Sequence, residues 1–352
     1  MKAAILVDTK TIQIQDVDTP SPGPGQMLIK VSYTGICGSD VPRVLDGRVH
    51  GFPIVLGHEF SGDVAAVGEG VDPALVGRRV AGIPLEPCFQ CENCAQGNYS
   101  LCGSYGFIGS RSNGSFAEYV LVNKENVFFV DPSVTALQAA FFEPATVAIH
   151  GIELAHVQPG KSAIVLGGGT IGTLLAQALS HYGISTVVIT RQHEEDFASN
   201  IAAGLTNLVA TDHEGWQQQA LEQGECVQTG GFDYVFDTAG TPETILDAFT
   251  MAAPKATVCF VGTPKRDVCF TSSQWELINR KEMTVTGSWM SYSAPWPGKE
   301  WEIASALFAN GTLRVVDAMI QGIFPLDQIG HAFDLFAIPG AVKGKLVISS
   351  RD

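Results

Sequence analysis

Two rhythms of hydrophobic and polar positions divide this chain. Up to about residue 145, short β-type apolar runs such as AAILV, MLIKVSYTG and FAEYVLVN are separated by Gly and Pro, which predicts an irregular, β-rich segment. From PGKSAIVLGGGTIG onward, apolar strands such as TVVIT and YVFDTAG alternate with stretches of helical spacing such as TLLAQALSHYG. This alternation predicts a parallel sheet with helices on both faces.

The tail of the chain returns to the first rhythm. From about residue 288 the strand and helix alternation is lost, and the chain ends in the strand-like KLVISS. A length of 352 residues also favours two domains over one. We therefore expect an α/β protein in which a doubly wound parallel-sheet domain (148–287) is inserted into a discontinuous β-rich domain (1–147 and 288–352).

Charge and hydropathy exclude several classes of function. The chain has 36 acidic and 21 basic residues, a formal net charge of -15 and no Lys/Arg cluster, which disfavours binding to nucleic acid or anionic membranes. No window offers the ~18 uncharged apolar residues that a membrane span needs, and MKAAILVDTKTIQIQD lacks a signal-peptide cleavage pattern. We expect a soluble, cytoplasmic protein.

A glycine-rich turn follows the first strand of the parallel-sheet segment. The apolar Ile164, Val165 and Leu166 lead into a G-x-G-x-x-G motif and then into TLLAQAL. Such glycines allow a tight turn against a pyrophosphate, and the helix N-terminus supplies N–H donors. Gly-rich turns are common, but the strand before it and the helix after it favour a dinucleotide site. The candidate cofactor-binding residues are Gly167, Gly169, Thr170, Ile171, Gly172, Thr238 and Gly262.

The second strand, STVVIT, bears on the choice between NAD and NADP. An acidic residue at its end would accept a hydrogen bond from the adenosine ribose of NAD, but here Thr190 is followed by Arg191. The guanidinium of Arg191 is suited to a 2′-phosphate, which favours NADP. Alternatively, Arg191 is an exposed residue at the strand end and other contacts hold NAD.

Four closely spaced cysteines indicate a structural zinc site. They read C-x-x-C-x-x-C-x7-C and are Cys88, Cys91, Cys94 and Cys102. Four thiolates suit tetrahedral zinc with every coordination position filled. Free or disulfide-paired cysteines are the alternative, which the spacing disfavours in a cytosolic protein. Cys226, Cys259 and Cys269 match no ligand spacing, and we expect them to be packed thiols without a function.

A second, scattered set of residues is suited to a catalytic zinc. It comprises Cys37 in GICGSD, His58 and Glu59 in GHEFSG, and Glu143 in FEPATVAIH. One thiolate, one imidazole and carboxylates that leave a position for water or substrate fit such a site. A lone Cys or His is more often simply packed than metal-bound, so the residues alone leave this interpretation open.

These motifs, in this order, resemble the zinc-containing medium-chain dehydrogenase/reductase superfamily across essentially the whole chain. The resemblance implies a GroES-like β-rich catalytic domain, a Rossmann domain, NAD or NADP, and two zinc ions per chain. Glu143, where ethanol-type enzymes have Cys, resembles the polyol-dehydrogenase branch. The resemblance further implies Cys37, His58 and Glu143 as catalytic-zinc ligands, Glu59 as a fourth or displaceable ligand, and Ser39 as a proton relay. Relatives carry Asp where Arg191 falls, which puts a preference for NAD in doubt.

Three segments, PCFQCENCAQGNYSLC, YGFIGSRSNGSFAEY and GSWMSYSAPWPGKEWE, resemble the galactitol 1-phosphate dehydrogenase subfamily of this branch. The resemblance implies oxidation of galactitol 1-phosphate to tagatose 6-phosphate. Arg43, Arg111 and Lys345 are then candidate phosphate contacts, or alternatively surface ion-pair residues. The aromatic segment 289–301 is interpreted as lining the substrate cleft, burying a subunit contact or packing in the core.

Three rival functions remain at this point. The first two are oxidation of an unphosphorylated polyol of the sorbitol or iditol type, and oxidation of L-threonine. The third is a non-catalytic protein that keeps the fold and the cofactor. For any of these we expect a small-molecule ligand and a homodimer or homotetramer, because symmetric homo-oligomers are usual among soluble enzymes.

Overall fold

The computed structural model describes residues 1–190 and 197–351, and the chain divides into two compact units. The β-rich unit comprises Met1–Glu143, Tyr292–Ala309 and Ile320–Asp352; the parallel-sheet unit comprises Pro144–Ser291 and Asn310–Met319. The domain boundaries expected at 147/148 and 287/288 stay predictions. The hydrophobic pattern of the C-terminal tail does not predict that residues 310–319 join the parallel-sheet unit.

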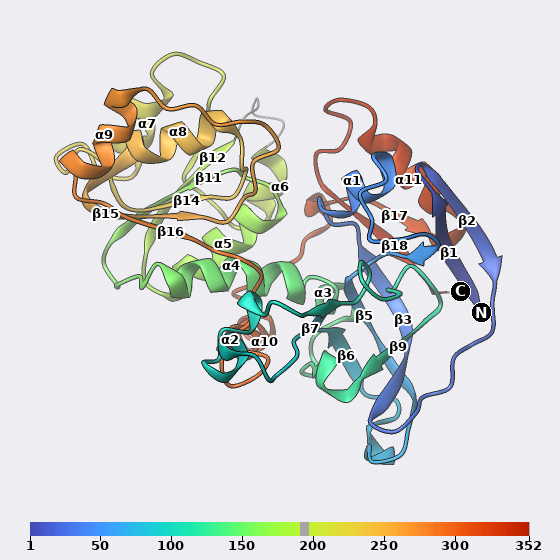
Figure 1. The fold of residues 1–352 in the computed structure, drawn as a ribbon. Helices are drawn as coiled ribbons and strands as arrows, with labels where there is room; N and C mark the ends of the chain where they lie inside the picture. The colour runs from blue at the N-terminus through green and yellow to red at the C-terminus, as the bar shows by residue number, and fades with distance from the viewer. Residues whose placement is uncertain (191–196, 352) are drawn as a thin grey trace. The chain divides into compact units, whose positions relative to one another are not determined.

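Antiparallel pairing dominates the β-rich unit (Figure 1). Its largest sheet has the order β10-β6-β5-β3-β18-β17, with β9 also paired to β3, beside a sheet β2-β1-β4 and a pair β7-β8. The strands are β1 (Lys2–Asp8), β2 (Thr11–Asp16), β3 (Gln26–Gly35), β4 (Ile54–Val55), β5 (Glu59–Val67), β6 (Arg79–Gly82), β7 (Leu85–Glu86), β8 (Gly106–Phe107), β9 (Tyr119–Asn123), β10 (Val127–Phe129), β17 (Ile320–Pro325) and β18 (Lys345–Ser349).

Strand β3 organises this unit, because it pairs antiparallel with β5, β9 and β18. Its apolar side chains, among them Ile29 and Val31, are buried with Phe60 of β5 and Val120 of β9. The helices of the unit are α1 (Asp40–Leu45), α2 (Glu92–Ala95), α3 (Ala136–Ala139), α10 (Lys299–Ala309) and α11 (Ile329–Phe336). The first residues of α4 (Phe142–Leu154) also belong to it. The core around β3 is therefore built mainly by the strands of its own sheet.

The aromatic segment 289–301 is largely core. Tyr292 and Trp301 are 2% and 0% exposed, and their rings stack with centroids 6.1 Å apart. Tyr292 also stacks on Trp296. Core packing is therefore the correct interpretation for these residues, whereas Trp289 is 52% exposed.

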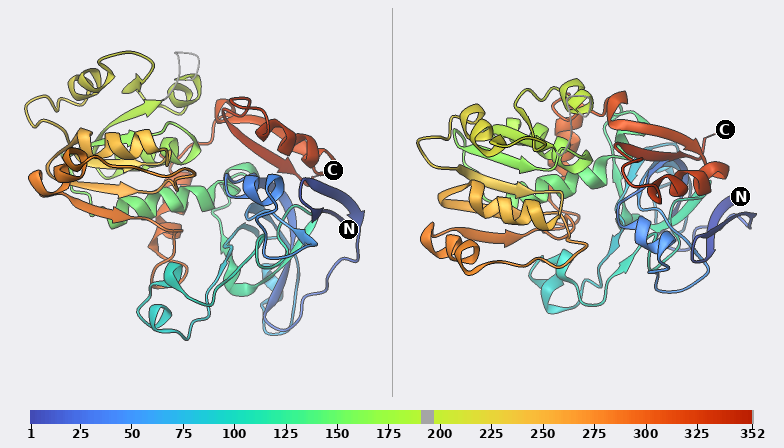
Figure 2. Two further views of the ribbon diagram at one scale, coloured as in Figure 1. Left: turned by 45° about the horizontal axis from the view of Figure 1, so that its top comes forward. Right: turned by 90° about the horizontal axis from the view of Figure 1, so that it is seen from above.

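The parallel-sheet unit has six parallel strands in the order β13-β12-β11-β14-β15-β16. The strands are β11 (Ser162–Leu166), β12 (Ser185–Thr190), β13 (Leu208–Ala210), β14 (Phe232–Asp237), β15 (Ala252–Phe260) and β16 (Thr284–Gly287). Strand β16, drawn in orange, forms one edge of the sheet (Figure 2). This arrangement confirms the Rossmann-type sheet predicted from the alternation of strands and helices.

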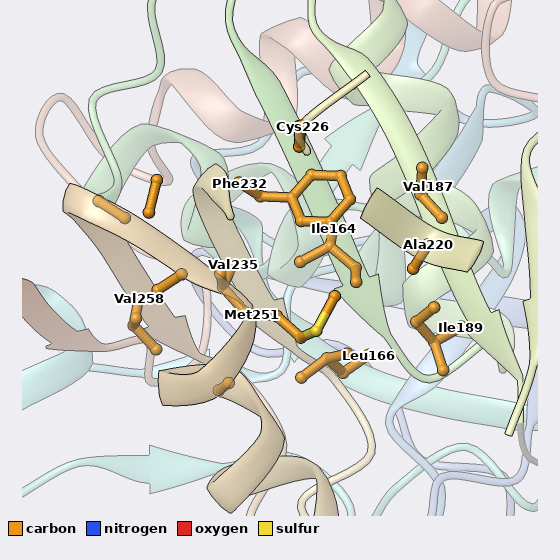
Figure 3. Close-up of a cluster of buried hydrophobic side chains, with 14 of the residues drawn as sticks. Ile164, Leu166, Val187, Ile189, Ala220, Cys226, Phe232, Val235, Met251 and Val258 are labelled. Carbon is orange, nitrogen blue, oxygen red and sulfur yellow. The ribbon is translucent and has the colours of Figure 1, made fainter. Parts of the chain in front are cut away.

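Helices cover both faces of this sheet. Helices α4 and α5 lie on one side, and α7, α8 and α9 on the other (Figure 1). Their bounds are α5 (Thr170–His181), α6 (Phe197–Ala202), α7 (Trp216–Gln223), α8 (Pro242–Met251) and α9 (Ser272–Arg280). Figure 3 shows the core on the second side, where Ile164, Val187 and Val235 of the strands lie with Ala220 of α7 and Met251 of α8. In the described residues, no helix has the length and apolar character needed to cross a membrane.

Candidate metal centres and dinucleotide site

The four clustered cysteines converge in one small lobe of the β-rich unit. The Sγ atoms of Cys88, Cys91, Cys94 and Cys102 all lie within 4.8 Å of one another. The Sγ–Sγ distances Cys88–Cys94 and Cys91–Cys102 are both 3.9 Å. Zn–S bonds of ~2.3 Å in a tetrahedron place sulfurs about 3.8 Å apart. The spacing of the thiols therefore fits a four-thiolate zinc site.

Backbone N–H groups prepare these thiols for a metal. The Cys91 N–H donates to Cys88 Sγ (3.3 Å), and the Cys88 N–H donates to Cys102 Sγ (3.4 Å). Hydrogen bonds from the backbone of Gln90 and Cys91 lower the pKa of Cys88 to about 6, whereas burial raises the pKa of Cys94 to about 12. A cation is therefore needed to hold all four sulfurs as thiolates at neutral pH.

The other cysteines stand apart from this lobe. All eight cysteines are unpaired thiols, so the disulfide alternative is not realised. Cys226 and Cys259 are buried, as packed thiols should be. The expectation is wrong for Cys269, which is exposed because it lies in the connection between β15 and α9, and connections run over the surface.

Strand register assembles the second group of metal-ligating residues. Antiparallel pairing of β3 with β5 places Gly35 opposite Glu59. Cys37 follows the end of β3, and His58 immediately precedes β5, so the three side chains meet. Ligand atoms of Cys37, His58 and Glu59 lie within 4.8 Å of one another. A thiolate, an imidazole and a carboxylate in one place form a donor set that zinc accepts.

Glu143 reaches this group electrostatically from the first turn of α4. It is not one of the three residues whose ligand atoms lie within 4.8 Å of one another. Burial, together with the nearby charge of Glu59, raises the pKa of Glu143 to about 7. A half-buried carboxyl with a raised pKa near a second carboxylate marks a place where a cation would be stabilised. The charge of the group therefore acts on Glu143, and its role as a ligand stays a prediction.

Lys345 supplies a positive charge inside the same site. Its ammonium forms an ion pair with Glu59 Oε2, and both side chains are buried. Pairing of β18 with β3 brings Lys345 here, because Val347 lies opposite Gly35. A Cβ on Gly35 would displace the ends of the Glu59 and Lys345 side chains, so glycine here leaves room for their ion pair. The sequence placed Lys345 among candidate phosphate contacts and gave no sign of this pairing.

Asp40 contacts both Cys37 and His58, and the sequence analysis did not identify it. It is fully buried, and its Oδ2 accepts a hydrogen bond from the Cys37 N–H (3.1 Å). Its Oδ1 lies 3.4 Å from His58 Nδ1. Burial would lower the pKa of His58, but the charges of Asp40 and Cys37 outweigh it and raise that pKa well above 6.5. The only signal in the sequence was its place three residues after Cys37.

Arg43 and Ser39 extend this network outward. The Arg43 guanidinium donates to Asp40 Oδ1 (3.0 Å) and to Ser39 Oγ (3.1 Å). Ser39 is exposed beside Cys37, which suits a hydroxyl that passes protons to solvent. Arg111 is exposed and lies over the ring of Tyr105. These contacts test neither the predicted proton relay by Ser39 nor the predicted phosphate contacts of Arg43 and Arg111.

The glycine motif forms the turn between β11 and α5. Gly167 has φ +119°, and a Cβ on Gly172 would collide with the Gly167 carbonyl oxygen, so both positions require glycine. Gly169 is the N-cap of α5, and Thr170 and Ile171 form its first turn. Thr238 Oγ1 donates to the Gly167 carbonyl (2.9 Å), and Gly262 N–H donates to the Asp237 carbonyl (2.9 Å). The turn thus presents the N–H groups of a helix start, as a pyrophosphate site requires. Arg191 lies outside the described residues.

Sequence comparisons match both units to known dehydrogenases. The family described as "Alcohol dehydrogenase GroES-like domain" matches residues 23–132, and "Zinc-binding dehydrogenase" matches residues 170–309. Galactitol 1-phosphate 5-dehydrogenase of Escherichia coli K12 is 40% identical over 82% of this chain and 83% of its own. Sorbitol dehydrogenase of Bacillus subtilis is 32% identical over 76% of each chain.

Solved structures agree with these matches. The crystal structure of galactitol-1-phosphate dehydrogenase from Escherichia coli superposes with a TM-score of 0.91 at 36% identity, over 99% of this chain and 100% of that one. A zinc-binding dehydrogenase from Sinorhizobium meliloti bound to NADP superposes with a TM-score of 0.84 at 29% identity, over 99% and 98%.

Proposed function

Because this chain belongs to the polyol-dehydrogenase branch of the zinc-containing medium-chain dehydrogenase/reductase superfamily, we propose that it oxidises galactitol 1-phosphate to tagatose 6-phosphate. The chain is a zinc-dependent alcohol dehydrogenase that uses NAD or NADP. The observation that carries the finer proposal is 40% identity to a galactitol 1-phosphate 5-dehydrogenase, against 32% to a sorbitol dehydrogenase. The reaction moves a hydride from the alcohol carbon to the nicotinamide and a proton from the hydroxyl to solvent.

Two groups of residues hold zinc in this proposal. Cys37, His58 and Glu143 are the ligands of the catalytic ion, with Glu59 as a fourth or displaceable ligand. The structural ion is held by Cys88, Cys91, Cys94 and Cys102. The close donor atoms of Cys37, His58 and Glu59 and the four close sulfurs support these assignments. When bound, the catalytic zinc supplies a Lewis acid that lowers the pKa of the substrate hydroxyl.

The protein's own residues prepare the site for proton loss and hydride transfer. Asp40 holds the imidazole of His58 and the backbone of Cys37 in place. Lys345 balances the charge of Glu59, so Glu59 is held back while Cys37, His58 and Glu143 bind the metal. Ser39 accepts the proton of the substrate hydroxyl and releases it to solvent, and Arg43 orients the Ser39 hydroxyl.

The cofactor is held by the parallel-sheet unit. The N–H groups at the start of α5 bind its pyrophosphate, and Thr238 and Gly262 shape the neighbouring strand ends. Arg191 takes the place where an acidic residue would receive the ribose of NAD, so we propose that it favours the 2′-phosphate of NADP. The Arg191→Asp variant should shift the preference toward NAD, measured as the ratio of kcat/KM with the two cofactors.

The phosphate of the substrate needs a cation on the protein. We propose that Arg43 or Arg111 binds this phosphate, because Lys345 is buried in its ion pair with Glu59. The ion pairs of Lys345 with Glu59 and of Arg43 with Asp40 also favour a second candidate function, oxidation of a free polyol of the sorbitol type, since two of the three candidate cations are already paired. L-Threonine, which is small and carries a carboxylate in place of a phosphate, is the third substrate to test.

Initial rates decide among these substrates. The zinc-replete enzyme is assayed with galactitol 1-phosphate, galactitol, sorbitol and L-threonine, each with NAD and with NADP. Our proposal predicts rapid turnover with the phosphorylated polyol alone. Equal or faster turnover of a free polyol or of threonine would contradict it and leave the coarser assignment of a zinc polyol dehydrogenase.

Two further parts of the proposal concern the enzyme in the cell. We propose a cytoplasmic location and a homodimer or homotetramer, the usual outcome for soluble metabolic enzymes. Light scattering after size-exclusion chromatography would measure the assembly, and a monomer would contradict it.

A further inference from the structure

Helix α6 has an inverted pattern of burial around Asn200. The side chain of Asn200 is 1% exposed, whereas the adjacent Ile201 is 59% exposed. A helix on a protein surface ordinarily buries its apolar residues and exposes its amides. Where a sequence breaks this rule, a functional requirement is the common reason.

The buried amide of Asn200 is bonded to the glycine turn. Its Nδ2 donates to the Gly168 carbonyl (3.0 Å) and to Thr173 Oγ1 (2.7 Å), while Thr173 Oγ1 itself donates to the Gly168 carbonyl (3.2 Å). One carbonyl in the middle of the turn thus accepts hydrogen bonds from two helices, α5 and α6.

The carbonyls on either side of Gly168 are also held. Thr238 Oγ1 donates to the Gly167 carbonyl, and the Thr173 N–H donates to the Gly169 carbonyl (2.8 Å). In a trans peptide the N–H points away from the carbonyl of the preceding residue. Holding these carbonyls therefore directs the following N–H groups the other way, toward the place of an anion at the helix start.

Three consecutive glycines make this restraint necessary. Glycine adopts positive and negative φ with similar ease, so the Gly168–Gly169 peptide has little intrinsic resistance to rotation. A rotated peptide would turn a carbonyl oxygen, not an N–H, toward the phosphates. A Cβ on Gly168 would meet Thr190 Cγ2 at 2.5 Å and Asn200 Oδ1 at 3.3 Å, so these side chains also close the space beside the turn.

We propose that Asn200 is a positioning residue for the dinucleotide: it fixes the Gly168–Gly169 peptide so that the Gly169 N–H faces the pyrophosphate. This inference rests on the proposed cofactor role of the Gly167–Gly172 turn. Asn200 touches the turn and not the cofactor, so its loss acts through the backbone. The loss of affinity should therefore be limited to ligands that contain the pyrophosphate.

The test compares Asn200→Ala with Gln177→Ala. Gln177 is also buried, and its Nε2 joins α5 to the Ala203 carbonyl (2.8 Å) just beyond α6. The control variant therefore weakens the same packing without touching Gly168. Dissociation constants are measured by fluorescence for NADH and NADPH and by calorimetry for ADP-ribose and adenosine, together with thermal unfolding and steady-state kinetics.

We expect Asn200→Ala to weaken the binding of NADH, NADPH and ADP-ribose by about tenfold, because of the two hydrogen bonds that it removes only the one to the Gly168 carbonyl restrains this peptide directly. Adenosine, which lacks the pyrophosphate, should bind as before, and the KM for the cofactor should rise with little change in kcat. Gln177→Ala should lower thermal stability with no such loss. Unchanged binding in Asn200→Ala, or an equal loss for adenosine or in Gln177→Ala, would overturn the proposal.

A second variant covers the case in which Asn200→Ala does not fold. Thr173→Val removes the second donor to the Gly168 carbonyl, the Thr173 hydroxyl, and keeps the shape of the side chain, whereas Thr173→Ser keeps the hydroxyl. We expect a loss of roughly two- to fivefold in the first, limited to pyrophosphate ligands and rescued in the second. No loss, or no rescue, would contradict the role of this carbonyl. A wild-type protein that binds neither dinucleotide would instead overturn the cofactor site itself.

Discussion

The two metal centres of the β-rich unit are built in opposite ways. The four-cysteine lobe takes all its ligands from fifteen consecutive positions, Cys88 to Cys102, and backbone N–H groups of the same loop bond to its sulfurs. The proposed catalytic centre draws Cys37 and His58 from segments that the pairing of β3 with β5 brings together, and Glu143 from the first turn of α4. The local site has four ligands of one chemical kind, whereas the assembled site has Asp40 and Lys345 as partners for His58 and Glu59. We therefore expect the four-cysteine site to contribute mainly to stability and the assembled site to catalysis.

The largest effect should follow from removing a ligand of the assembled site. We expect His58→Ala to lower kcat/KM by roughly a thousandfold or more, because the Lewis acid supplies several kcal/mol to the reaction. The midpoint of thermal unfolding should also fall, because His58 is buried beside Asp40, so turnover is compared per folded molecule. His50→Ala, at an exposed position, is the control, and turnover above a tenth of the wild-type rate in His58→Ala would contradict the assignment.

Removing a ligand of the local site should act on stability. We expect Cys102→Ser to lower the unfolding midpoint by about 10 °C, because loss of a structural zinc site costs several kcal/mol. Residual turnover per folded molecule at low temperature should stay within severalfold of wild type. The exposed Cys269 provides a matched Cys→Ser control. An unchanged midpoint together with lost turnover would reverse the roles of the two centres.

Asp40 offers a smaller and more selective effect. Asp40→Asn keeps the shape and removes the charge that faces His58, so zinc affinity or kcat/KM should fall by about 10–100-fold, as for other residues that orient a ligand. Asp46→Asn, at the exposed C-cap of the same helix, is the control. Zinc affinity, measured by chelator competition, distinguishes the orienting role of Asp40 from a loss of folding. Equal zinc affinities in Asp40→Asn and Asp46→Asn would contradict that role.

The pH dependence of zinc binding gives the smallest effect. Burial and the charge of Glu59 raise the pKa of Glu143 from its ordinary 4.5 to about 7. Since zinc requires the carboxylate, zinc affinity at the assembled site should fall below about pH 7, by up to tenfold per pH unit for one proton.

In the metal-free protein Glu143 binds its proton more tightly when the chain is folded. Its contribution to the free energy of unfolding is therefore present below pH 4.5 and is lost as the pH rises through 7. Glu143→Gln should remove this pH dependence, and a persistent dependence would assign it elsewhere.

The difference between the two centres also explains what the sequence predicts and what it does not. The four-cysteine site and the turn from Gly167 to Gly172 are local, so spacing alone indicates them. The pair of Lys345 with Glu59 depends on the registers of β3 with β5 and of β18 with β3, which no local pattern contains. Asn200 is missed for the same reason, because it meets Gly168 across 32 positions. Long-range register is therefore the information that the structure adds.

The zinc content of the purified enzyme tests the central claim most directly. Our account predicts two zinc ions per chain by elemental analysis. A chelator at mildly acidic pH should remove one ion with reversible loss of turnover, and the second should leave only as the protein unfolds. A single zinc per chain, or full turnover in the protein depleted of one ion, would contradict the assignment of a structural and a catalytic centre.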